Sequence, residues 1–451
     1  MTFNAALSNA LSGMTAAQAR IQVASHNVAN ASTPGYARRD ASLAARAPSG
    51  GVVVASVERA RAGRAEALAL GADALAAETR AQAEAAGALD ALLGEPGDAR
   101  GLYAALTRFE TALDDLAATP EGVDLQEGLL GAARDLAATF TRLGDGAQAA
   151  RAEADAEVAA RVADVNRALA ELDHLNDARE AGGLSDLPER RRALIETVAE
   201  NLDVRVRTDA RGRVRIATAA GVPLLGDAPT LLRFRPAGVM AAGNTIETGH
   251  LSGISAGGIE LTPGRGPQGA RTGAIAGLLA VRDEAAPTFA ARLDALAEGL
   301  SARLAAADTD GAGGLLRTTN GPGAASRMTV SAAADPAQGG ALHRLRDGLT
   351  ATAPGPAAAP GVLPALQDAL AGFAGEAEAL ASSVGTARLS ADRAADAASA
   401  ARQSLRDDVL ARTGVNTDQE LQSLLLIEQA YAANARVVQV ASDMMARLME
   451  L

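Results

Sequence analysis

The side chains that could carry out catalysis or bind a metal are scattered along this sequence. Its four histidines are His26, His174, His250 and His343. None of them has a second histidine four residues away, the spacing that places two imidazoles on one face of a helix. A solvated or hydrogen-bonded side chain is therefore the better interpretation of each histidine.

The segment Asp308-Thr309-Asp310-Gly311 resembles the beginning of a calcium-binding loop. It lacks the further carboxylate before the glycine and the distal glutamate that complete such a loop, so a turn is the better interpretation. The remaining carboxylates are spread over the faces of predicted helices, where solvation is their usual state. The sequence therefore predicts no enzyme, no cofactor and no metal site.

Composition limits the possible partners and the possible folds. The chain has 451 residues, a net charge of −12 and a pI of about 5.0, so neither nucleic acid nor an anionic membrane surface is an expected partner. Cysteine is absent, which excludes disulfides and thiolate metal sites. Aromatic residues make up only 2% and alanine is abundant, a composition that favours long helices packed through small side chains.

The sequence also limits the ways in which the protein could enter a membrane or leave the cell. No apolar run approaches the ~20 residues of a membrane span. The first residues, MTFNAALSNAL, lack the basic and continuously apolar regions of a cleavable secretory signal. If the protein leaves the cell, we expect it to do so by another route.

Two apolar stripes, one near each end, are the elements that organise the chain. Within residues 420–451 the stripe advances alternately by three and four residues, and the N-terminal segment repeats this spacing. A mean period of 3.5 residues is typical of a coiled-coil seam, so the sequence predicts that the two terminal helices pair. Asn434, the single polar member, would fix their register. The predicted assembly interface consists of Phe3, Leu7, Met14, Ile21, Val28, Leu424, Ile427, Tyr431, Asn434, Val438, Met445 and Leu448.

The expected stability of this helix pair is low. About eight modest apolar side chains per helix contribute on the order of 10 kcal/mol when buried, whereas each ordered backbone residue costs about 1–2 kcal/mol. Two interpretations follow: the helices belong to the core of one bundle, or they become ordered when subunits assemble. The second is favoured because both stripes are rich in alanine and methionine and lie where most domains fray.

Between the stripes, the pattern predicts a mainly α protein with a smaller β portion (α+β). It would have long terminal coiled-coil helices, an elongated helical bundle domain and a central β-containing excursion. The expected segments are 1–57, an N-terminal helix and extended chain; 58–201, the first part of the helical domain; 202–270, a β-hairpin-containing segment; 271–410, the return part with an irregular 308–364; and 411–451, the C-terminal helix.

Periodicity and turn signals place the elements within these segments. Helices are expected at about 58–93, 102–118, 124–181, 188–201, 273–307 and 366–410, with a possible break of the third at Gly144-Asp145-Gly146. Residues 204–208 and 214–218 alternate as a hairpin, residues 51–57 are expected to form a strand, and further short strands are expected near 230–236 and 258–262.

The stretch that follows the first helix carries a resemblance to a known family. Asn27-Val28-Ala29-Asn30, followed by Ser32-Thr33-Pro34-Gly35-Tyr36, resembles the signature of the flagellar rod, hook and hook-associated axial proteins. Asparagines can cap a helix end and tolerate unusual dihedral angles, and Pro-Gly forces a turn. The motif residues are Asn27, Asn30, Thr33, Pro34, Gly35 and Tyr36.

Other segments narrow the resemblance to the hook-associated junction proteins. These are Gly414–Leu421, Gln429–Val437, and Leu187–Leu194 leading into the 204–218 hairpin. The resemblance covers roughly residues 1–60, 180–220, 270–300 and 385–451. The segment from about 220 to 270 is short for the outer β-domain of longer members, so that domain is expected to be reduced or absent.

This resemblance implies a structural protein of the bacterial flagellum that joins the hook to the filament and self-assembles through its terminal helices. Its implied partners are further copies of itself, the hook protein, a second junction protein, and an export chaperone that holds residues 421–449. It would be secreted through the flagellar type III apparatus without loss of a signal peptide. The alternatives are another axial subunit (rod, hook or second junction protein) and a soluble coiled-coil scaffold or signalling protein.

Overall fold

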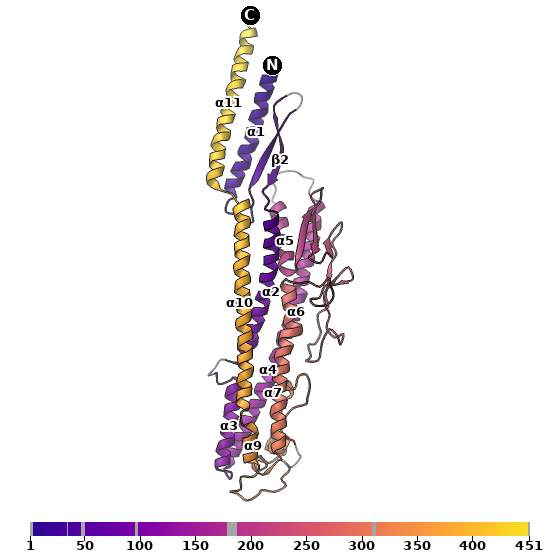
Figure 1. Cartoon of the computed structure of the whole chain (residues 1–451), viewed down its shortest axis with the longest axis vertical. Helices are drawn as coiled ribbons and strands as arrows, with labels where there is room; N and C mark the ends of the chain where they lie inside the picture. Colours follow the sequence, from indigo (N-terminus) through magenta and orange to yellow (C-terminus); the bar gives the residue numbers. More distant parts are fainter. Residues whose placement is uncertain are drawn as a thin grey trace. The chain divides into compact units, whose positions relative to one another are not determined.

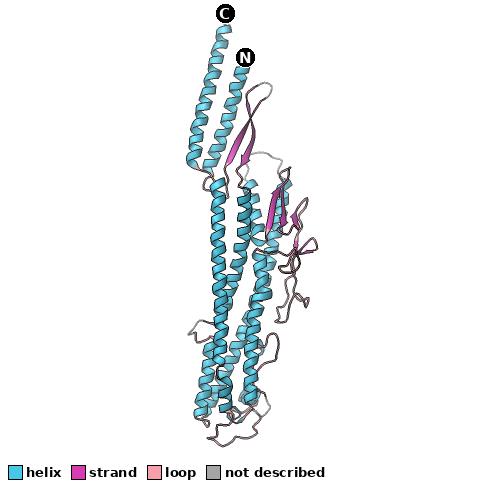
Figure 2. Cartoon of the chain, in the orientation of Figure 1, coloured by secondary structure: helices cyan, strands magenta, loops and turns pink. Residues whose placement is uncertain are grey.

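The computed structural model describes residues 3–33, 35–46, 50–94, 98–177, 187–308 and 313–449. Long helices dominate and the strands form only small sheets (Figure 2), which confirms the predicted fold class. The chain divides into two compact units. The first contains Met1–Ala72, Asp177–Glu196 and Ala400–Leu451, and the second contains Asp73–Asn176 and Thr197–Ser399.

The first unit is built on the two terminal helices and one hairpin. Helices α1 (Phe3–Ala29) and α11 (Thr417–Met449) lie side by side (Figure 1). Strands β1 (Arg39–Ala45) and β2 (Val52–Arg59) pair antiparallel and pack on α1. The strand expected at 51–57 is therefore present as β2, whereas β1 was not predicted from the sequence.

The second unit is a helical bundle with a large apolar core. Its main helices are α2 (Arg64–Leu93), α3 (Leu102–Ala118), α4 (Val123–Asp177), α7 (Ala286–Ala307), α9 (Leu363–Leu370) and α10 (Phe373–Thr413), of which α2 and α10 extend into the first unit. The core includes Phe109, Phe140 and Phe373, each at most 1% exposed, among many buried leucines. Helix α4 has 55 residues, a length of about 80 Å, so the bundle is elongated as predicted.

Helix α4 runs without interruption through the glycines that the sequence marked as a possible break. A Cβ atom on Gly144 would lie 2.9 Å from the backbone nitrogen of Ser326, and one on Gly146 would lie 2.8 Å from the side chain of Leu92. These glycines therefore allow close packing, which offsets their low helix propensity. The expected end of this helix, residues 178–181, lies outside the described residues.

Three other predicted helices have different boundaries from those expected. The helix expected from residue 58 begins at Arg64, because β2 continues to Arg59. The helix expected at 273–307 consists of α6 (Ala274–Ala280), a π turn η2 (Val281–Ala285) and α7. The helix expected at 366–410 is two helices, α9 and α10, because Gly372 between them has a φ of 78°.

The β-containing segment follows helix α5 (Leu187–Asn201). Strands β3 (Val204–Thr208), β4 (Val214–Thr218) and β5 (Pro223–Leu225) form an antiparallel sheet, so the predicted hairpin is present. A second sheet contains β6 (Leu232–Arg233), β7 (Ser255–Ala256) and β8 (Ile259–Glu260), each of only two residues.

The segment expected to be irregular, 308–364, has little regular secondary structure but packs into the core. Its described part contains β9 (Leu316–Arg317), β10 (Thr329–Val330), three 3-10 turns (Ala325–Arg327, Ala332–Ala334 and Pro336–Gln338) and α8 (Arg344–Asp347). Leu316 and Leu345 are at most 2% exposed. Of the candidate calcium loop, Asp308 accepts a hydrogen bond from the backbone nitrogen of Leu349 (3.1 Å), and 309–311 lie outside the described residues.

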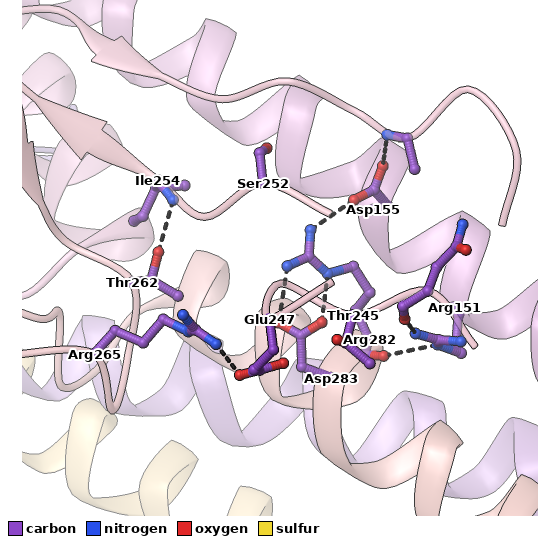
Figure 3. A network of polar contacts seen from close by, with 12 residues as sticks. Arg151, Asp155, Thr245, Glu247, Ser252, Ile254, Thr262, Arg265, Arg282 and Asp283 are labelled. Atoms are coloured by element: carbon purple, nitrogen blue, oxygen red, sulfur yellow. Dashed lines mark hydrogen bonds and ion pairs between the residues drawn. The ribbon is translucent and has the colours of Figure 1, made fainter. Parts of the chain in front are cut away.

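A buried polar network fixes the loop before β7 to the helices of the second unit (Figure 3). Arg282, in the π turn, is fully buried and donates to Asp155 (2.7 Å) and to both oxygens of Asp283 (2.8 Å). The second oxygen of Asp155 accepts from a backbone N–H of the 237–244 segment (2.7 Å). Arg151 donates to carbonyl groups of the same segment. The network is paired throughout, and its observed role is to hold this loop.

Candidate assembly site

The pairing of α1 with α11 is antiparallel, as two contacts along it show. Asn27, near the end of α1, donates to the carboxylate of Glu420 near the beginning of α11 (3.2 Å). Gly13, two heptads earlier in α1, faces Asn434, two heptads later in α11. The two helices therefore keep one register over at least four turns, as a coiled-coil seam requires.

The structure places the predicted stripe residues along this pairing, but it buries them unequally. Ile427 is 3% exposed, and the alanines of the two stripes, Ala10, Ala17, Ala24 and Ala441, are at most 7% exposed. The larger members are half-buried: Leu7, Met14, Ile21, Val28, Leu424, Tyr431, Asn434 and Val438. Met445 is 40% exposed. The side chains of Phe3 and Leu448 lie outside the described residues, although both positions are helical.

Asn434 occupies a position that only a small opposing residue permits. A Cβ atom on Gly13 would lie 2.8 Å from Asn434 Nδ2 and 3.0 Å from its Cγ. The Asn434 amide itself donates to the carbonyl of Ala430 one turn earlier (3.0 Å). The contact of Asn434 with α1 is therefore close packing against Gly13. A shift of the helices by one heptad would place a larger residue opposite it.

A polar cluster lies where the end of α1 meets the beginning of α11. It consists of Asn27, Tyr36, Arg39, Glu189 and Glu420, and we call it the Asn27 cluster. Asn27 is 1% exposed. Its amide donates to the Arg39 carbonyl (2.8 Å) and to Glu420, and its oxygen accepts from the Arg39 nitrogen (2.9 Å) and the Tyr36 hydroxyl (2.8 Å). One side chain thereby joins α1, the turn after it, β1 and α11.

The turn after α1 is held by the other residues of the motif. Asn30 donates to the His26 carbonyl (2.9 Å) and accepts from Thr33 (3.3 Å), so it closes the end of the helix. Gly35 has a φ of 76°, a conformation that favours glycine. Pro34 lies outside the described residues. Every described residue with a positive φ is a glycine, so the asparagines act here through their side chains and not through unusual backbone dihedral angles.

Tyr36 is a buried member of this turn rather than a surface turn residue. It is 6% exposed, and its hydroxyl lies 2.9 Å from His26 Nδ1. Because that hydroxyl donates to Asn27, the histidine nitrogen must be the donor in the second bond. Burial and the charges of Glu189 and Glu420 raise the pKa of Tyr36, against the opposing effect of Arg39, so the phenol stays neutral at physiological pH.

Charged residues from distant parts of the sequence complete the Asn27 cluster. Arg39 is 7% exposed and donates to Glu189 of α5 (3.2 Å), and Arg59 of β2 lies 3.8 Å from the other oxygen of the same carboxylate. Burial lowers the pKa of Arg59, followed by the charge of Arg192. Sequence reasoning missed Arg39, Glu189 and Glu420, because partners separated by 150 or more residues leave no local spacing signal.

Exposed apolar side chains are concentrated in the first unit. This unit holds about a third of the residues, but about two thirds of the large apolar side chains that are exposed among the described residues. Those of the hairpin include Leu43, Val53 and Val57, between 42% and 48% exposed. Large apolar side chains exposed to solvent in such numbers favour interaction with another protein.

One sequence pattern with possible catalytic meaning was missed. Residues 253–257, GISAG, match the Gly-x-Ser-x-Gly pattern that presents a nucleophilic serine when a strand leads into a helix. Here Ser255 lies in β7, which turns directly into β8, so the context of that motif is absent. Within the described ranges no three histidine, aspartate or glutamate side chains form a group that could hold a metal ion. None of the helices described is long and apolar enough to cross a membrane.

Three family models match the chain. The model for the flagellar hook-associated protein FlgK helical domain matches residues 86–321. The model for the flagella basal body rod protein matches residues 7–36, which hold most of α1 and the turn after it. The model for the flagellar basal body rod FlgEFG protein C-terminal region matches residues 407–451, which hold α11. The two rod models thus cover the two helices that form the candidate assembly site.

Comparison with individual proteins adds less. The chain is similar to the flagellar hook junction protein FlgK from Burkholderia pseudomallei, with 19% identity and a TM-score of 0.47 over 56% of this chain. The match spans 47% of that protein. A search of curated proteins finds no match.

Proposed function

On the premise that this chain belongs to the FlgK family of flagellar hook-associated proteins, because the helical-domain model of that family matches just over half of it, we propose that it is a subunit of the hook–filament junction. It would assemble with further copies of itself through α1 and α11. The observation that carries this proposal is the antiparallel α1–α11 pair, which lies in the segments matched by the rod models and leaves much of its apolar surface exposed.

The role we propose is mechanical and not enzymatic. A junction subunit must bind the hook protein on one side and a second junction protein on the other, and it must hold its shape under load. The long helices and the apolar core of the second unit suit this demand. Neither nucleic acid nor membrane lipid is proposed as a partner, since the net charge is −12.

We also propose that the chain reaches the flagellum through the flagellar export apparatus without cleavage of a signal peptide. An export chaperone would hold residues 421–449 before assembly. Leu421, Leu425 and Leu426 are 52–66% exposed on the folded chain, and such a surface aggregates unless a partner covers it.

Removal of the gene from the source cells tests the proposed function. Electron microscopy should show hooks without filaments, and flagellin should appear in the medium. The full chain should restore filaments and motility, whereas the chain without residues 420–451 should stay folded in its second unit and restore neither. Normal filaments in the deleted strain would contradict a junction role and favour a scaffold protein.

Amide exchange of the purified monomer tests the dependence of the terminal helices on assembly. We expect fast exchange in residues 3–14 and 434–449, which are farthest from the Asn27 cluster, and slow exchange there in isolated hook–filament junctions. Strong protection of both ends in dilute monomer would show that the pair is complete without neighbours, against the proposal.

A further inference from the structure

The loop that connects β9 to β10 contains the one Asn-Gly pair of the sequence, Asn320-Gly321. Asn320 is exposed, and its side chain makes no hydrogen bond to any residue that the structure describes. Gly321 has a φ of 98°, and no atom lies within 4 Å of the position that a Cβ atom on it would take. The side-chain amide of Asn320 and the backbone nitrogen of Gly321 are therefore both unhindered.

A carboxylate is bonded to this backbone nitrogen. The N–H of Gly321 donates to Oε1 of Glu298, in helix α7, at 2.7 Å. This is the short distance of a bond to an ionised acceptor. It also lies within the 2.6–3.2 Å over which a side chain can act as general base towards a proton.

The loop around the pair is fixed by two further side chains. Asp294, one turn before Glu298 on α7, accepts hydrogen bonds from two backbone N–H groups of the loop (2.7 and 2.8 Å). Arg327 donates to the carbonyl groups of Thr319 (3.1 Å) and Pro322 (2.9 Å), which lie on either side of the Asn-Gly pair. The Glu298 carboxylate and the Gly321 N–H are thus held together in advance, with a positive charge beside them.

We infer that Asn320 is a site of self-modification, at which Glu298 acts as general base for the conversion of the asparagine to aspartate and isoaspartate. The inference goes beyond the proposed function and does not depend on it. It assigns a chemical role to a loop that the fold alone would explain as a connection between two short strands.

The reaction needs only the chain and water. Glu298 removes the proton from the Gly321 nitrogen, and this nitrogen attacks Asn320 Cγ, so that an N–Cγ bond forms. The Cγ–Nδ2 bond breaks, and the amide group takes up the proton and leaves as ammonia. Water then opens the resulting five-membered imide at one of its two carbonyl carbons. Opening at Cγ gives aspartate, and opening at the backbone carbonyl gives isoaspartate.

Each event changes the loop permanently. A neutral amide is replaced by a carboxylate, so the net charge of the chain changes from −12 to −13. In the isoaspartate product the backbone also passes through the side chain of residue 320 and gains a methylene group. The Arg327 guanidinium, bonded to groups on both sides of this residue, would favour the new negative charge.

The hydrogen bond from Gly321 to Glu298 has a second interpretation with the opposite consequence. If Glu298 only restrains the loop, its removal should free the Asn-Gly pair and speed the reaction. If Glu298 is the base, its removal should slow the reaction. Glu298→Gln separates the two, because it keeps the size of the side chain and removes the basic carboxylate.

Asp294→Asn is the matched control. It loosens the same loop from the same helix but leaves the bond between Glu298 and the reacting nitrogen intact. The purified full-length chains would be incubated at neutral pH, and the modified fraction of residue 320 followed by peptide mass spectrometry. Glu298→Gln should react at least tenfold more slowly than the unchanged chain, and Asp294→Asn at an equal or higher rate. Asn320→Gln should give no signal at this position.

A comparison of folded and unfolded chain needs no variant. Folding normally slows this reaction, because it restricts the rotation that brings the nitrogen to Cγ. A general base that exists only in the folded chain reverses the order, so the native protein should react at least fivefold faster than the same chain in urea at the same pH. Circular dichroism of each variant would confirm that it is folded.

Three results would overturn the assignment. One is a rate in folded Glu298→Gln that equals or exceeds that of the unchanged chain, which would leave Glu298 only a restraining role. Another is an equal loss of rate in Asp294→Asn, which would show that loop order and not the base matters. The third is faster modification in urea than in the native protein.

Discussion

Replacement of Asn27 by alanine should weaken the attachment of the β1–β2 hairpin to helices α1 and α11. The side chain makes four hydrogen bonds, two of them to the backbone of Arg39, and it is 1% exposed. Alanine is a better helix former than asparagine, so α1 itself is not weakened. The variant therefore tests the polar cluster and not the helix.

The expected loss follows from the groups that remain. Without Asn27, the backbone N–H and carbonyl of Arg39 lose a buried partner, and each such loss costs about 1–3 kcal/mol. Tyr36 keeps its contact with His26. The gain in helix propensity returns about 0.5 kcal/mol, so the net destabilisation should be about 1.5–5.5 kcal/mol.

Amide exchange of the hairpin, residues 39–45 and 52–59, measures this loss. Since about 1.4 kcal/mol corresponds to a factor of ten, exchange there should become roughly 10 to 10,000 times faster. Asn30→Ala is the control, because Asn30 is only half-buried and its side chain bonds a helix-end carbonyl; its effect should be about threefold or less. Equal hairpin exchange in Asn27→Ala and the unchanged chain would refute the assigned role.

Three further predictions concern the second unit, each measured by denaturant unfolding. Gly144→Ala should destabilise it by about 1–3 kcal/mol through overpacking, whereas Gly128→Ala, with open space at its Cβ position, should stabilise it by about 1 kcal/mol. Arg282→Met should cost about 3–5 kcal/mol, because a buried aspartate loses its partner. Burial and the charge of Asp203 raise the pKa of Glu78 above 4.5. The native state therefore holds this proton more tightly than the unfolded state, and stability falls as pH rises above about 4.5. Glu78→Gln should reduce that fall between pH 4 and 8.

The elements with a regular period could be predicted from the sequence. The heptad stripes identify the two terminal helices and place both sides of their contact, and Val204–Thr208 with Val214–Thr218 alternate around a turn as a hairpin should. Helix α3 has the predicted bounds, Leu102–Ala118, because a glycine precedes it and a proline follows it closely. In each case the signal is local.

The errors arose where tertiary contact overrides local preference. Gly144 and Gly146 read as a helix break, yet their lack of a Cβ atom is what allows α4 to pack closely at that point. Strand β1 has a weak β pattern and exists through its pairing with β2 and its packing on α1. The described part of 313–364 is rich in glycine, alanine and proline but contributes Leu316 and Leu345 to the core. No local spacing carries this information.

About half of the candidate site could be named from the sequence, because only some of its residues belong to a local pattern. The stripe residues follow from periodicity, and Asn27 and Tyr36 follow from the family motif. The joining of Asn27 to Glu420, and of Arg39 to Glu189, brings together residues 393 and 150 positions apart. A single sequence offers no sign of such pairs.

The two units differ in the side chains that they bury, and this difference bears on assembly. The second unit buries leucine and phenylalanine, each contributing about 1.5–3 kcal/mol. Among the described residues of the first unit, the buried apolar side chains are mostly alanines, with Val23, Tyr36, Val409 and Ile427 the larger ones. Burial of an alanine methyl contributes about 0.8 kcal/mol, less than the cost of ordering its backbone. We therefore expect a unit of this composition to gain further stability when other subunits cover the apolar side chains that it leaves exposed.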